Sequence, residues 1–278
     1  MMGTLRVTLI DVGWGDSILI ESEDDHSNLS YGLIDSNDTT TLRSSYIFVK
    51  RYLERKGMKI EDRKPIFSFV LLTHAHADHG QGLKAILRAF GAKNFWYPKS
   101  LNWSSMVDLI RFVGQSPAVE HHQSVDDTKI LPPLGDVSMQ VLWPPYNQID
   151  ANSENNNSVV LSLGLGNVSF LLAGDAEESV WDQIASRIPA NTQFFKVPHH
   201  GSKNGTFDAQ NNTAWFNHCP PNAKLGISSH IRPFSHPDQE VIHLFDSNHR
   251  EYFRTDEHYH VTFTTDGNTT HVKYSHLV

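Results

Sequence analysis

The segment that most constrains the fold is residues 65–80, "PIFSFVLLTHAHADHG". Its first half is an almost continuous apolar run, which is the pattern of a β-strand covered on both faces. The second half follows at once and brings His74, His76, Asp78 and His79 within six positions. The chain is therefore predicted to contain a sheet with packed layers on both sides and a polar, ligand-rich loop where one strand ends.

The histidine loop has the composition of a metal site. Side chains two apart in a strand-to-helix turn can converge on one ion, as His74 and His76 would, while Asp78 and His79 would face a second ion. Neutral imidazoles and carboxylates suit Zn²⁺, Mn²⁺ or Fe²⁺. The chain has one cysteine, Cys219, so a thiolate cage is not available. A solvated loop with coincidental histidines is the competing interpretation, and four ligands in six positions argue against it.

Strand and helix patterns alternate from one end of the chain to the other. The spacing of apolar residues predicts helices over 46–56, 82–90, 103–114, 177–188 and 238–247. No Pro/Gly/Ser-rich linker interrupts this alternation. We therefore expect one α/β domain over residues 1–278.

A weak internal repeat in the order of strands and helices predicts how the site is assembled. A strand ending in Asp35, a helix and a strand ending in His74 are followed later by a strand ending in Asp175, a helix and a strand ending in His199. Two halves of this kind, facing one another, would bring an acid and a histidine each to one site between two sheets.

The other candidate ligands each have a second interpretation. Asp175 ends an apolar strand, where it either bridges two cations or caps the helix that begins near Glu177. One of His199 and His200 is expected to complete the second metal site, while the other holds a substrate oxygen or orients a ligand. Asp35 either orients the histidine loop by hydrogen bonding or is an ordinary turn acid.

Charge and hydropathy limit the classes of partner. The formal net charge is −8 and no extended Lys/Arg run is present, which argues against a broad nucleic-acid footprint. A catalytic pocket neutralised by divalent metal escapes that objection. No run approaches the ~18 apolar residues that span a bilayer, and the N-terminus lacks the pattern of a secretory signal. We expect no membrane insertion and a cytoplasmic location.

The motifs, in their order, resemble the metallo-β-lactamase superfamily. More narrowly, they resemble the soluble metallo-β-lactamase-like domain of the ComEC DNA-uptake proteins and its free-standing relatives, over about residues 4 to 270. The segments that carry the resemblance are "VTLIDVGWGDSILI", "LLTHAHADHGQGL", "ENNNSVVLSL", "FLLAGDAE" and "FKVPHHGSKNG". The resemblance implies a four-layer αβ/βα sandwich with two divalent metal ions, Zn or Mn, at one sheet edge.

The resemblance also implies roles for individual residues. The candidate catalytic residues are Asp78, His200 and His236, the last of which has an alternative interpretation as a residue that only starts a helix before Pro237. The candidate metal ligands are His74, His76, Asp78, His79, Asp175, His199 and His200, with one of the last two expected to bind.

Three departures from the pattern concern ligation and specificity. Where superfamily members with two full metal sites usually have a further histidine, this chain has "ENNNSVV", with Asn155 and Ser158 matching the narrower group. Trp14 stands where the group usually has glutamine, and Asp238 replaces a second histidine. We therefore expect a less complete site at His74 and His76, and substrate selection by the other two positions.

The sequence predicts a metal-dependent hydrolase, a phosphodiesterase or nuclease that uses a metal-activated water on a phosphoester such as DNA or a nucleotide. The first alternative is a hydrolase of small phosphoesters, a phosphorylcholine ester or a nucleotide, which the acidic net charge favours. Lactam or thioester hydrolysis ranks lower, because the downstream motifs match the phosphoester branch better. A non-catalytic metal-binding module is a further alternative, which the full set of acids and histidines disfavours.

Overall fold

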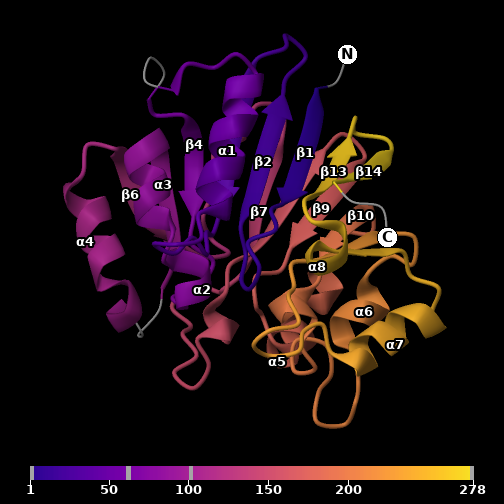
Figure 1. The fold of residues 1–278 in the computed structure, drawn as a ribbon. Helices are drawn as coiled ribbons and strands as arrows, with labels where there is room; N and C mark the ends of the chain where they lie inside the picture. Colours follow the sequence, from indigo (N-terminus) through magenta and orange to yellow (C-terminus); the bar gives the residue numbers. More distant parts are fainter. Residues whose placement is uncertain (1–2, 61–63, 100–102, 276–278) are drawn as a thin grey trace.

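The computed structural model describes residues 3–60, 64–99 and 103–275 of the chain, in which two β-sheets pack face to face (Figure 1). The eight-stranded sheet has the order β14-β13-β1-β2-β3-β4-β5-β6, and the six-stranded sheet has the order β12-β11-β10-β9-β8-β7. The strands of the first sheet are β1 (Thr4–Leu9), β2 (Ile18–Glu23), β3 (Leu29–Ile34), β4 (Phe67–Leu71), β5 (Ala92–Pro98), β6 (Val119–Val125), β13 (Val261–Thr265) and β14 (Thr270–Tyr274). Those of the second are β7 (Ser138–Trp143), β8 (Val160–Leu165), β9 (Val168–Leu172), β10 (Thr192–Lys196), β11 (Lys224–Ile227) and β12 (Tyr252–Arg254).

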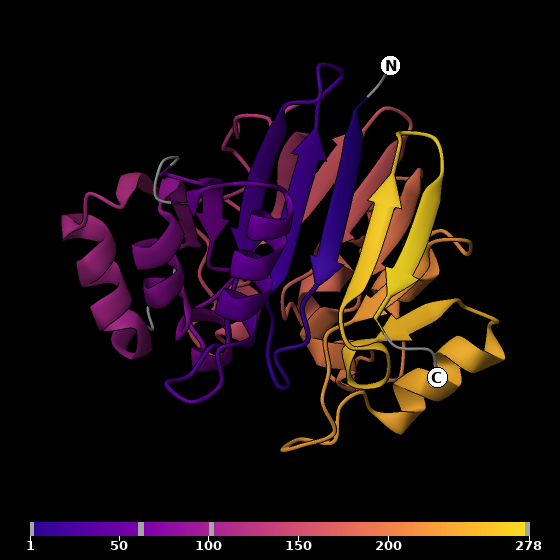
Figure 2. The same ribbon diagram turned by 45° about the horizontal axis from the view of Figure 1, so that its top comes forward.

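Helices cover the outer face of each sheet, which gives four layers (Figures 1 and 2). The eight-stranded sheet packs against α1 (Ser44–Arg55), α3 (Leu83–Phe90) and α4 (Val107–Gln115), and the six-stranded sheet against α5 (Glu178–Ile184), α6 (Ala214–His218) and α7 (Gln239–Ser247). Two single-turn helices, α2 (Ala77–Gly80) and α8 (Thr255–His258), lie in loops. The predicted four-layer sandwich is confirmed. In the described part of the chain, the helices are all too short or too polar to cross a membrane.

The five predicted helices are present, with two changes at their ends. The helix expected over 103–114 begins as a 3₁₀ turn and becomes α-helical at Val107. The helix expected over 177–188 ends at Ile184 and continues only as a 3₁₀ turn, Ala185–Arg187. Pro189 explains why Ile188 is extended, with φ of −60° and ψ of 122°, since the residue before a proline avoids the α-helical conformation.

The near-continuous apolar sequence of β4 follows from its position between two cores. Phe69 and Leu71 point into the core between the sheets, whereas Val70 points into the core beneath the helices. Successive side chains of a strand point to opposite faces, so a strand covered on both sides has to be apolar at nearly every position.

The strands that carry the candidate ligands end at the same edge of the sandwich. In the first sheet β3, β4 and β5 run parallel, and in the second β9, β10 and β11 do. Loops at the carboxyl ends of parallel strands gather on one side of a sheet. The loops after β3 and β4 therefore face those after β9 and β10. This is the arrangement of two facing halves that the internal repeat predicted.

Phe194 of β10 joins the two sheets. Its ring is fully buried and stacks on Phe263 of β13, with ring centroids 3.9 Å apart. We predict that Phe194→Ala lowers the free energy of unfolding by about 3–5 kcal/mol, because it leaves a cavity between the sheets. Urea unfolding is the measurement, and Ile130→Ala is the control: that side chain is 97% exposed, so its loss should change stability by less than about 0.5 kcal/mol. Equal effects of the two substitutions would contradict this account of the core.

Candidate metal centre

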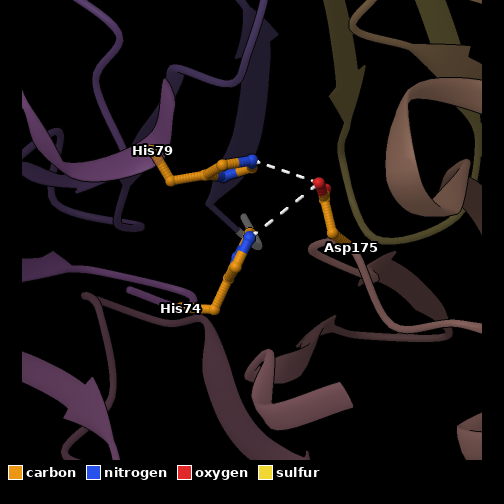
Figure 3. A group of neighbouring side chains, drawn as sticks. All are labelled: His74, His79 and Asp175. Carbon is orange, nitrogen blue, oxygen red and sulfur yellow. Dashed lines mark ion pairs between the residues drawn. The ribbon is translucent and has the colours of Figure 1, made fainter. Parts of the chain in front are cut away.

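The carboxylate of Asp175 lies at the centre of a histidine cluster. Its Oδ2 atom is 3.2 Å from Nε2 of both His79 and His200, and 4.0 Å from Nε2 of both His74 and His199. Figure 3 shows the rings of His74 and His79 directed at Asp175, whose carboxylate faces them. The cluster thus joins the end of β4 in one sheet to the ends of β9 and β10 in the other.

The remaining predicted ligands lie at the two ends of this cluster. Asp78 Oδ2 is 3.8 Å from His79 Nε2 and 3.9 Å from His200 Nε2. At the other end, Nδ1 of His76 is 3.0 Å from Nε2 of His74. All seven residues named as candidate ligands therefore come together. Two groups among them, His74 with His79 and Asp175, and Asp78 with His79 and His200, have the close spacing that a metal ion requires.

An unusual backbone turn carries the two adjacent histidines. His199 and His200 have φ angles of 45° and 54°, in the left-handed region that residues other than glycine rarely adopt. Such strain persists where the surrounding structure imposes it, and it concentrates at functional sites. Nδ1 of His200 lies 2.8 Å from the Ser228 carbonyl oxygen, so an Nδ1–H donated there leaves Nε2 facing Asp175 and Asp78.

Asp35 orients the histidine loop, as one of its two sequence interpretations predicted. Its Oδ2 atom is 2.7 Å from Nδ1 of His79 and accepts a 2.6 Å hydrogen bond from the Thr73 hydroxyl. The Thr73 backbone N–H donates to Oδ1 at 2.8 Å. An aspartate that holds Nδ1 of a histidine directs Nε2 toward a ligand position, which here faces Asp175.

The charges of the cluster are set by burial and by neighbouring groups. Burial opposes ionisation of Asp175, but His200 and His79 outweigh it and hold the pKa of that carboxyl well below its usual range. Burial also opposes a charged His79, and Asp175 and Asp35 reverse this and raise its pKa well above the usual value. Burial and the nearby His79 lower the pKa of His74 well below the usual value, which leaves a neutral ring ready to bind a cation.

The sequence analysis did not predict that Lys196 and Asp16, two buried charged residues, belong to the centre. Nζ of Lys196 is 2.5 Å from Asp16 Oδ2 and 3.7 Å from Asp175 Oδ1, and it donates a 3.1 Å hydrogen bond to the Gly174 carbonyl oxygen. Burial disfavours the ammonium form, but Asp16 and Asp175 outweigh it and raise the pKa of Lys196. The missed signal was a lysine inside the apolar strand "TQFFKV", since a buried cation needs a carboxylate partner.

Asn155 and Ser158, which stand near the place of the missing histidine, contact the centre in different ways. Nδ2 of Asn155 lies 3.4 Å from Nε2 of His199 and donates to Glu177 Oε1 at 3.0 Å. The Ser158 hydroxyl oxygen accepts a 3.1 Å hydrogen bond from the backbone N–H of Asp175. Asn155 therefore borders the pocket beside the cluster, and Ser158 fixes the backbone of Asp175, whose carboxylate is at the centre of the cluster.

A pocket of about 460 Å³ opens onto the cluster. His76, Asp78, Asp175 and His199 line one part of it, and Trp14 contributes to the remainder. This volume is within the range of small-ligand sites, about 300–1,000 Å³.

His236 lies beside the cluster rather than in it. Its ring centroid is 6.0 Å from that of His199, and its Nδ1 atom is buried with no hydrogen-bond partner among the described residues. Burial and the nearby His200 and His199 lower its pKa to about 4. At neutral pH the ring is uncharged, so it can donate a hydrogen bond from one N–H but has no extra proton to release.

Unsatisfied buried atoms show that a cation fits the centre. Nε2 of His79, Nε2 of His200 and Oδ1 of Asp175 are buried and have no hydrogen-bond partner among the described residues. Buried polar atoms normally find partners, so atoms that converge without one indicate a ligand. Imidazole nitrogens and carboxylate oxygens are ligands for Zn²⁺ and Mn²⁺.

The profile of the metallo-beta-lactamase superfamily matches residues 6–209, and the chain belongs to this superfamily, most of whose members are metal-dependent hydrolases. Together with the His/Asp centre, this supports a metal-dependent hydrolase.

Curated relatives and a solved structure agree with this membership. ComE operon protein 3 of Bacillus subtilis is 25% identical over 267 residues, 91% of this chain and 32% of the relative, so the chain spans about a third of that protein's length. Hydroxyacylglutathione hydrolase of Psychromonas ingrahamii is 24% identical over 204 residues, 66% of this chain and 73% of the relative. Unliganded yeast PDE1 shares the fold, with a TM-score of 0.51 and 11% identity over 94% of this chain and 99% of that one.

We predict that Lys196→Met lowers the free energy of unfolding of the metal-free protein by about 3–5 kcal/mol, because it leaves two buried carboxylates without their cation. Combining it with Asp16→Asn should recover part of this loss, since a neutral amide no longer needs the ammonium group. Denaturant unfolding of the single and double variants measures the coupling. Lys203→Met, which breaks the exposed pair with Glu240, is the control and should cost less than about 1 kcal/mol. Strictly additive effects of the Lys196 and Asp16 substitutions would refute the pairing.

Proposed function

We propose that the protein is a phosphodiesterase that works with two divalent metal ions, Zn or Mn. The observation that carries the proposal is the convergence of buried imidazole and carboxylate groups on Asp175, at the floor of an open pocket. The sequence motifs that surround these residues resemble those of phosphoester hydrolases. When bound, divalent ions at such a site supply Lewis-acid chemistry and lower the pKa of a water molecule.

The residues would divide the work as follows. His74 and His76 would hold one ion, Asp78, His79 and His200 would hold the other, and Asp175 would be a ligand to both. His200 is preferred over His199 for the second ion because its buried Nε2 faces both Asp175 and Asp78. His199 borders the pocket and would be a further ligand of the first ion, because this chain lacks the additional histidine that superfamily members with two full metal sites usually have.

Other residues orient these ligands or meet the substrate. Asp35 fixes the ring of His79, and Lys196 limits the negative charge around Asp175. His236 packs beside His199, which borders the pocket, and would hydrogen-bond a substrate oxygen there. With the two ions bound, the pocket would attract and orient an anionic phosphodiester.

A competing function is thioester hydrolysis, which the similarity to hydroxyacylglutathione hydrolase favours. A second competitor is hydrolysis of phosphorylcholine esters, which requires no extended basic surface. A panel of bis(p-nitrophenyl) phosphate, single-stranded DNA, p-nitrophenylphosphorylcholine and a hydroxyacylglutathione separates them, each assayed with Mn²⁺ and with Zn²⁺. Cleavage of the thioester alone would overturn the proposed activity.

We predict that Asp175→Asn reduces bound metal to one ion or fewer per chain and lowers phosphodiester hydrolysis by at least about 100-fold, because the shared anionic ligand is lost. His76→Ala should also lower both the amount of bound metal and the rate of phosphodiester hydrolysis. Metal content by mass spectrometry and initial rates are the two measurements. His121→Ala, which removes an exposed histidine from β6, should change neither. Full activity of metal-stripped Asp175→Asn protein would exclude the metal-dependent mechanism.

A further inference from the structure

Two aromatic side chains from opposite ends of the chain meet at the candidate metal pocket. Trp14 follows β1, and Phe234 lies in the loop between β11 and α7. Their ring centroids are 4.6 Å apart with the planes at 52°, and both residues line the pocket that His76 and Asp175 also line. The aromatic pair is therefore part of the wall of that pocket.

The pair offers an apolar surface that the fold leaves uncovered. The Phe234 side chain is 60% exposed. Apolar side chains left exposed at a polar pocket mark binding surfaces, because their hydration is unfavourable. Phe234 lines the same pocket as Asp175, so one ligand in that pocket would contact both.

The tryptophan has a fixed position relative to the metal centre. Gly15, the next residue, has φ of 92°, and a Cβ atom there would lie 2.3 Å from the carbonyl oxygen of Asp78. The Asn37 side-chain amide donates a hydrogen bond to the Trp14 carbonyl oxygen, and the indole packs on the His200 ring at 4.8 Å. The Trp14 ring is therefore held against His200, one of the candidate metal ligands.

We propose that Trp14 and Phe234 form a stacking platform for a nucleobase of the substrate. This inference rests on the proposed phosphodiesterase function and narrows its substrates to nucleotide esters, either free nucleotides or single-stranded nucleic acid. A nucleobase stacks on an aromatic face whatever its identity, and such a contact requires no extended basic surface. An acidic protein can thus select a nucleotide through one base and one phosphate.

The same geometry disfavours a choline group as occupant. Aromatic cages for quaternary ammonium groups surround the cation with several ring faces, each within about 6 Å of it. Here the two rings touch each other, and the indole also packs on the rings of His200 and His236. The rings therefore pack on one another at 52° rather than around a cation, and the Phe234 ring, 60% exposed, offers a face on which a flat base can stack.

The test uses three p-nitrophenyl esters with one leaving group: the thymidine 5′-phosphate, methyl phosphate and phosphorylcholine esters. We predict that the parent protein prefers the thymidine ester to the methyl ester by at least about 10-fold in kcat/KM. Phe234→Ala should lower kcat/KM for the thymidine ester about 10- to 100-fold, mainly through KM, while the methyl ester changes less than about 3-fold. Trp14→Ala should reduce the preference for the thymidine ester over the methyl ester by a similar factor. Phe234→Tyr should retain the preference. Tyr146→Ala, at a side chain 58% exposed and outside the pocket, is the matched control.

Binding to the metal-free protein gives a second measurement that does not depend on activity. Thymidine 5′-monophosphate and fluorescent oligothymidylate should both bind more weakly to Phe234→Ala, and an abasic oligomer of equal length should bind parent and variant alike. Preference for the strand over the mononucleotide would identify single-stranded nucleic acid as the source of the base. Equal losses for abasic and base-containing ligands, or a preference for the phosphorylcholine ester, would overturn the platform. If no phosphodiester is cleaved with either metal, the proposed function fails, and the binding data still decide whether the platform exists.

Discussion

The buried carboxylate of Asp175 is the group on which the rest of the centre depends. Asp16, Asp35 and Asp175 are fully or almost fully buried near one another at one edge of the sandwich. Removing such charges from water costs several kcal/mol each unless partners compensate. Lys196 and the imidazoles of the cluster provide that compensation. The imidazoles in this balance are also metal ligands, so divalent cations at the centre would take the place of their protons as partners of these carboxylates.

The two sheets have complementary parts in this arrangement. The first sheet delivers a rigid histidine loop, whose His79 ring is held by Asp35. The second delivers the central carboxylate and the strained turn at His199 and His200. Neither edge alone brings together the groups around Asp175 Oδ2. Packing of the sheets, through rings such as Phe194, thus sets the distances in the centre.

Much of the fold and of the candidate site could be predicted from the sequence, because the strand ends carry the unusual residues. The apolar run before His74 indicated a strand covered on both faces, and the resemblance to the metallo-β-lactamase superfamily implied the four layers. Helix α6 and strand β12 were missed because five and three residues are too few to show a period. Asp16 and Lys196 were missed for another reason: a lysine inside the apolar strand indicates a carboxylate partner, but local spacing does not show that this partner is Asp16, in the loop after β1.

Selectivity in this protein has to arise close to the centre. With a net charge of −8, long-range attraction opposes the approach of an extended polyanion, and screening leaves only contacts within about 10 Å effective at ordinary ionic strength. The discriminating groups are then those of the pocket wall itself. Trp14 and Phe234 are large, close to the ligands and, in the case of Trp14, fixed by the loop that also carries Asp16. One loop thereby carries both Asp16, which pairs with Lys196 in the centre, and Trp14, which lines the pocket beside it.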